Sequence, residues 1–108
     1  MPLRWYIAQR LTALAMAPLV VIHLGVMIYA ANTGLSAEAI LQRTRGSLVW
    51  ATVYELFVLA AAVHAAAGLR AVLSETVASD ALASRLAVLF ALPLLALGSF
   101  AVYAVVGS

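Results

Sequence analysis

The chain has 108 residues, which is enough for a single domain. Hydrophobic residues make up 67% of it and charged residues only 9%, against roughly 45–50% and about 25% in soluble domains. So few charges cannot cover a soluble protein, and six scattered arginines against four acidic residues form no basic patch for nucleic acid. Cysteine is absent, which excludes disulfides, thiolate-bound metals and a cysteine nucleophile.

Three apolar runs follow one another along the chain, at residues 11–31, 48–69 and 86–106. A helix needs about 20 residues to cross the hydrocarbon core, and only helices and closed barrels satisfy their backbone groups there. The runs therefore predict an all-α membrane protein with three transmembrane helices, up, down and up, forming a single membrane-anchor domain over residues 1–108. The first run is longer than a signal-peptide core of roughly 7–15 residues and contains His23, so we expect a retained span.

The connectors, residues 32–46 and 70–85, are polar, with Ser79 and Asp80 as turn or capping residues in the second. Residues 36–42 predict a short helix at the membrane surface. The arginines near the span ends divide four to two, with Arg4, Arg10, Arg70 and Arg85 on one side and Arg43 and Arg45 on the other. The positive-inside rule then places the N-terminus in the cytoplasm. Connectors this short leave no room for a soluble catalytic domain, so we expect a membrane subunit of a larger complex.

Three ionisable residues fall inside the predicted spans: His23 in the first, and Glu55 and His64 in the second. Such groups cost roughly 2.5–3.5 kcal/mol on insertion scales and are candidates for function. His64 lies in an alanine-rich segment from Ala60 to Gly68, whose small side chains would let a flat haem approach the backbone. The alternative is that the small residues serve helix packing and His64 makes an interhelical hydrogen bond.

The two histidines are predicted at different depths. At 1.5 Å per residue, His64 lies ~9 Å along its helix from Arg70, whereas His23 lies ~20 Å from Arg10. One haem cannot readily take both residues of one chain. Either two haems are stacked across the membrane, each with a second ligand from a partner chain, or His23 makes a hydrogen bond within the bundle. Glu55 matches the depth of His23, which predicts a His23–Glu55 contact, with Glu55 facing away from a haem at His64.

The start of the first span gathers polar side chains around Arg10: Tyr6, Gln9 and Thr12 lie within one turn of it, and Trp5 precedes them. A guanidinium beside hydroxyl and amide groups could polarise a quinone carbonyl. The alternative is a snorkelling arginine in an aromatic belt. Arg70 likewise has two interpretations, a partner for a haem propionate or a membrane anchor. Pro18 and Pro93 lie inside spans, where they can kink a helix.

These residues resemble the cytochrome b556 membrane anchor family of succinate dehydrogenase, a succinate:quinone oxidoreductase. Residues 6–13 are similar to its pattern Ser-Ile-x-His-Arg-x-Thr/Ser-Gly, and residues 64–71 to His-x-x-x-Gly-Ile-Arg-His. The matching residues are Arg10, Thr12, His64, Gly68 and Arg70, and the 54 positions from Arg10 to His64 are typical of the family. The departures are Tyr6, Gln9, Ala13 and Ala71, and Glu75 stands one place from the family's acidic residue. The resemblance covers residues 5–76.

The resemblance implies that the chain forms half of a haem-binding helical bundle with a second three-helix anchor protein. Together they would hold an iron–sulfur subunit and a flavoprotein on the bacterial cytoplasmic membrane and pass electrons to quinone. His64 would ligate haem b beside Gly68 and Arg70, and His23 would ligate a second haem, as in two-haem members. The residues implied at the quinone site are Trp5, Tyr6, Gln9, Arg10 and Thr12. The succinate chemistry would belong to the other subunits.

Two alternatives remain at this point. One is a cytochrome b anchor of another respiratory enzyme, such as a formate dehydrogenase or a hydrogenase, although such anchors usually have more helices and more intramembrane histidines. The other is a haem-free assembly or regulatory subunit, in which His23 and Glu55 hold helices together. The sequence leaves open the quinone type, the number of haems, the direction of catalysis and the oligomeric state.

Overall fold

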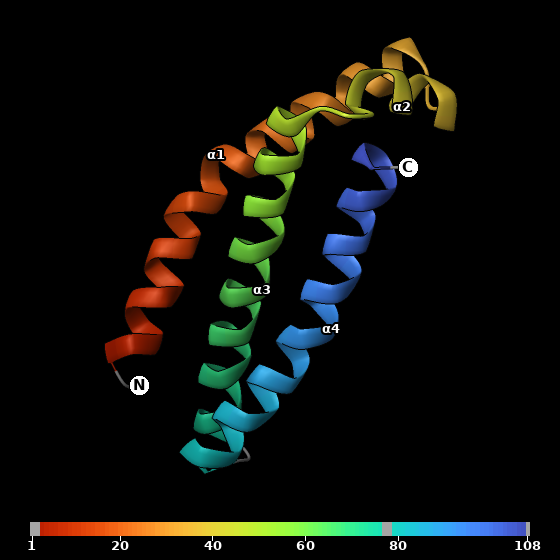
Figure 1. The fold of residues 1–108 in the computed structure, drawn as a ribbon. Coiled ribbons are helices and arrows are strands. Elements are labelled where there is room, and N and C mark those ends of the chain that lie inside the picture. The colour runs from red at the N-terminus through yellow and green to blue at the C-terminus, as the bar shows by residue number, and fades with distance from the viewer. Residues whose placement is uncertain (1–2, 77–78, 108) are drawn as a thin grey trace.

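The computed structural model describes residues 3–76 and 79–107, and this part of the chain forms four helices and no strand (Figure 1). They are α1 (Leu3–Thr33), α2 (Ala37–Thr44), α3 (Leu48–Thr76) and α4 (Asp80–Val106). Helices α1, α3 and α4 are each long and apolar enough to cross a membrane. The predicted all-α membrane fold with three spans is therefore confirmed.

The helices extend beyond the apolar runs that predicted them. Helix α1 begins at Leu3, α3 continues past Arg70 to Thr76 and α4 begins at Asp80, so most of the predicted connector over residues 70–85 is helical. The hydrophobic pattern marks only the crossing of the ~30 Å hydrocarbon core, whereas the whole bilayer with its interfaces is about 40–45 Å thick. Polar residues end an apolar run without breaking a helix. Helix α4 starts where Ser79 accepts the Leu82 N–H at 3.2 Å, as expected of a capping residue.

The predicted surface helix exists as α2 and closes one end of the bundle. Ser36 caps it by accepting the Ala39 N–H at 3.1 Å. At its other end, the Thr44 hydroxyl donates to the carbonyl of Val105, and the Gly46 N–H donates to the carbonyl of Val106 at 2.7 Å. These bonds satisfy carbonyls in the last turn of α4, which have no partner within their own helix. Helix α2 is thereby fixed to the end of α4.

Helices α1 and α4 each pack mainly on α3, which lies between them in Figure 1. The apolar side chains buried among the described residues are all alanines: Ala30, Ala60, Ala62, Ala66, Ala67, Ala83 and Ala87. Small residues let helix backbones approach closely, which is a main source of helix association in a membrane. Packing of this chain against itself thus accounts for these seven of its 24 alanines.

Gly98 of α4 marks a point where α3 and α4 touch. A Cβ added there would lie 2.6 and 2.9 Å from the two methyl groups of Val58. We expect Gly98→Val to destabilise the helix pair by about 1–3 kcal/mol, the usual penalty of overpacking. The measurement is the thermal unfolding midpoint of the purified assembly in detergent. Gly25→Val is the matched control, because its Cβ would meet nothing within 4 Å, and Val58→Ala should restore the midpoint of the Gly98 variant.

Candidate functional site

His64 of α3 lies against the first turns of α1. Its Nδ1 atom is 3.2 Å from the Thr12 hydroxyl oxygen and 3.3 Å from the Gln9 carbonyl oxygen. The single hydroxyl proton of Thr12 goes to a backbone carbonyl of its own helix, to Ala8 at 2.6 Å or Gln9 at 3.1 Å. Nδ1 therefore faces two acceptors, and proton counting assigns it the ring hydrogen. Nε2 then has a lone pair, and no hydrogen bond from the described residues occupies it.

The small residues around His64 divide into two groups. Ala60 and Ala67 are buried by the chain's own helices, so packing accounts for them. Gly68, one turn after His64, borders open space, since an added Cβ would have no neighbour within 4 Å. Of the two small residues one turn before and after His64, Gly68 lies next to free space, whereas Ala60 is buried.

Arg70 connects all three spans at the N-terminal end of α1. Its Nε–H donates to the Ser84 hydroxyl of α4 at 2.8 Å, and its guanidinium carbon lies 5.3 Å from the ring centre of Trp5 in α1. The side chain is only 2% exposed, and its buried Nη1 has no hydrogen-bond partner. No carboxylate among the described residues pairs with it. A buried cation without a counter-charge is unfavourable unless an anionic group from outside the chain compensates it.

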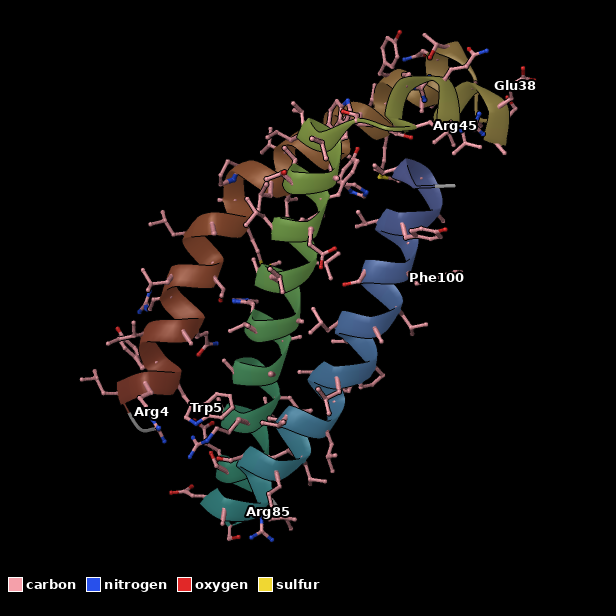
Figure 2. The ribbon with its side chains drawn as sticks, viewed as in Figure 1. Arg4, Trp5, Glu38, Arg45, Arg85 and Phe100 are labelled. Carbon is pink, nitrogen blue, oxygen red and sulfur yellow. The ribbon has the colours of Figure 1, made fainter. Side chains whose placement is uncertain are left out.

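The five residues predicted at the quinone site do not all gather in one place. Trp5 points between α1 and α3, toward Arg70 (Figure 2), and Gln9 and Thr12 contact His64. Arg10 and Tyr6 form a separate, exposed pair, with the guanidinium carbon 5.3 Å from the tyrosine ring centre. Residues four positions apart share one face of a helix, which explains the pairing of Arg10 with Tyr6.

His23 lines a cavity of about 650 Å³ at the opposite end of the bundle, with walls from all four helices. Its ring lies 5.4 Å from that of Phe57 and 6.1 Å from that of Tyr54, measured between centres. No hydrogen bond from the described residues reaches either ring nitrogen. Along α1, His23 is eleven residues, about 16 Å, from Thr12, so the two histidines lie at different levels.

Glu55 does not contact His23, and this prediction is wrong. Its carboxylate accepts a hydrogen bond from the Ser99 hydroxyl of α4 at 2.7 Å. Equal depth along two helices fixes only the level of two residues and not the direction in which each side chain points. Glu55 is oriented toward α4, whereas Tyr54 and Phe57 meet His23.

Arg43, which the sequence marks only as a charge near the span ends, lies on α2 in the wall of the His23 cavity. Its guanidinium carbon lies 5.2 Å from the ring centre of Tyr29, and it also borders an adjoining cavity of about 540 Å³. No local pattern reveals this position, because it depends on how α2 folds back over the ends of the spans. Figure 2 shows Arg45, two residues further on, at this end, and Arg4 and Arg85 at the other.

Three long apolar helices, with polar side chains meeting between them, are typical of a multi-pass membrane protein. The family model described as succinate dehydrogenase/fumarate reductase transmembrane subunit matches residues 1–102, and the chain belongs to this family. No curated protein and no solved structure matches the chain. The family membership favours this kind of anchor over those of formate dehydrogenases and hydrogenases.

Proposed function

We propose that the chain is an anchor subunit that binds haem b through His64 and helps to form the quinone site. Electrons would then pass from the iron–sulfur subunit to quinone. The observation that carries the proposal is the hydrogen bonding of His64. A histidine that ligates a metal uses one neutral ring nitrogen while the other donates to a fixed acceptor. His64 meets this requirement, because Nδ1 faces two oxygens of α1 and no hydrogen bond from the described residues reaches Nε2.

Two further features fit a haem at this position. Gly68 leaves space one turn from His64, as a flat macrocycle beside the helix requires. Arg70 has a buried, unpartnered Nη1 and no carboxylate partner among the described residues, so a haem propionate would supply the missing negative charge. The haem, when bound, supplies one-electron transfer at a potential set by its axial ligands. The chain orients the imidazole and keeps the site within apolar surroundings.

The second ligand of this haem would come from a partner anchor protein. Within the described residues His23 is the other histidine, and it lies about 16 Å along α1 from the level of His64. The end bearing Arg4 and Arg85 would face the cytoplasm of a bacterium and meet the iron–sulfur and flavoprotein subunits. Arg10 and Tyr6, an exposed pair near this end, would bind the quinone carbonyl.

The cavity beside His23 supports a second haem. Its volume of about 650 Å³ is within the roughly 300–1,000 Å³ of small-molecule pockets, and its walls are largely apolar. His23 would be the axial ligand, and Arg43 would face a propionate. We therefore propose a two-level arrangement, with one haem at each histidine.

The first measurement is the dithionite-reduced minus oxidised visible spectrum of the purified complex, with haem counted per flavin. A b-type α-band with two haems per flavin is the expected result. One haem per flavin would limit the proposal to His64 and leave His23 a structural residue. A spectrum without haem would contradict the cytochrome assignment and favour the haem-free anchor.

A further inference from the structure

The sequence places Thr12 with the quinone residues, but in the structure its hydroxyl is the side-chain group hydrogen-bonded to His64. We propose that Thr12 is a positioning residue for the haem ligand: its hydroxyl, held by α1, fixes the tautomer and ring direction of His64. Through His64 it raises the affinity for haem b and lowers its reduction potential. The inference rests on the proposed function, since it concerns the same haem.

The Thr12 hydroxyl cannot rotate freely to suit the histidine. It is held by its own helix, donating to the Ala8 carbonyl one turn earlier at 2.6 Å, with the Gln9 carbonyl as the other acceptor at 3.1 Å. Threonine in helices commonly makes this bond to the preceding turn. With its proton committed to the backbone, the oxygen presents only lone pairs to His64. Thr12 is therefore a fixed acceptor in the α1–α3 interface.

The Gln9 carbonyl reinforces the same assignment. It is 3.3 Å from Nδ1 and can only accept, so both neighbours of Nδ1 require the ring hydrogen there. A histidine with its hydrogen on Nε2 would face two oxygen lone pairs with its own lone pair. That state is repulsive, and its one free lone pair, on Nδ1, would face α1 and not the iron. The first turns of α1 thus select the tautomer that binds a metal.

An acceptor at the ring nitrogen that does not bind the metal affects the reduction potential of the metal as well as the orientation of the ring. It draws the Nδ1 hydrogen outward and makes the ligand more basic. A more basic ligand stabilises ferric over ferrous iron, which lowers the reduction potential. Loss of the Thr12 oxygen would leave only the longer bond to Gln9, so the ligand would become less basic and less firmly oriented.

The test compares Thr12→Val with Thr12→Ser and Thr52→Val in the assembled complex. Thr52→Val is the matched control, because the Thr52 hydroxyl donates to the preceding turn at 2.8 Å but faces no histidine among the described residues. Haem titrated into the haem-depleted complex should bind about 10–100-fold more weakly to Thr12→Val, the usual loss on removing such an outer partner. Thr12→Ser and Thr52→Val should retain wild-type affinity.

A redox titration of the haem α-band gives the second readout. Thr12→Val should raise the midpoint potential by the equivalent of about a tenfold change in the oxidised-to-reduced ratio, ~59 mV for one electron. Thr12→Ser should restore it. Equal affinities and potentials in Thr12→Val and Thr52→Val would overturn the inference, as would equal losses in Thr12→Val and Thr12→Ser.

If the valine variant fails to assemble, Thr12→Ala provides the same test, because it removes the same oxygen with a smaller side chain. It is measured in parallel. The same outcomes apply to it. A wild-type complex without haem is a different result, because it would contradict the proposed function itself. A wild-type complex that holds haem, with potentials indifferent to Thr12, would leave the proposed function standing and remove only the role of this residue.

Discussion

His64→Ala should remove the haem at the arginine-rich end while leaving the membrane assembly able to oxidise succinate with an artificial electron acceptor. The reason is that the imidazole would be the only bond from this chain to the iron. Alanine has no lone pair to bind iron in its place, and His23 lies about 16 Å along α1 from the level of His64. The measurement is the haem-to-flavin ratio and the α-band of the purified variant, in which one haem per flavin should be lost.

Val63→Ala is the matched control for this experiment. It removes side-chain atoms next in sequence to His64 from a residue that is 42% exposed and shares no polar contact with α1. It should keep the full haem content. Full haem in His64→Ala would contradict the assignment of the ligand, and the same loss in both variants would attribute the effect to packing of α3 rather than to the imidazole.

The fold could be predicted in outline because hydrophobicity and helix formation are coupled inside a membrane. The three apolar runs predicted α1, α3 and α4, and the short segment at residues 36–42 predicted α2. The ends were not predictable from the same signal. Arg70 ends an apolar run in the sequence, yet it is one of the most buried side chains in the structure, because three helices meet around it.

Parts of the candidate site could be predicted from residue spacing within one helix. Parts that depend on the direction in which a side chain points could not. The spacing of His64 and Gly68 identified the face beside which open space exists. The partner of Glu55 could not be predicted, because two residues at one depth can point to different helices. The partner in the structure is Ser99. Arg43 reaches the His23 cavity only through the way α2 is fixed to α4.

The way the spans pack bears on how the chain would join a complex. Helices α1 and α4 both pack on α3, yet α3 still exposes large apolar side chains, Leu59 and Val63 among them. A partner bundle laid on one face could complete the surroundings of His64. On the Nδ1 side of the imidazole, the contacts within this chain are already made, by the Thr12 hydroxyl and the Gln9 carbonyl. The ligand would thus be pre-oriented before the partner binds.

Arg10→Ala should lower quinone reduction by roughly 10–150-fold, the equivalent of the about 1.5–3 kcal/mol of a hydrogen bond to a charged group. The guanidinium is exposed beside the Tyr6 ring, where it can donate to a quinone carbonyl and stabilise the negative charge that develops on reduction. Succinate oxidation by an artificial acceptor should be unchanged, because the electrons then bypass the quinone. The measurement is the ratio of the two rates in the purified complex.

Arg4→Ala separates this role from the general effect of positive charge. Arg4 is also exposed, lies on the same helix and marks the same end of the bundle (Figure 2), but it is outside the group around Arg10. If charge at this end only orients or anchors the protein, both variants should lower the two rates together. If Arg10 contacts quinone, only Arg10→Ala should lower the ratio of quinone reduction to artificial-acceptor reduction, and Arg10→Lys should recover part of it, since lysine keeps the charge and a donor but loses the planar fork.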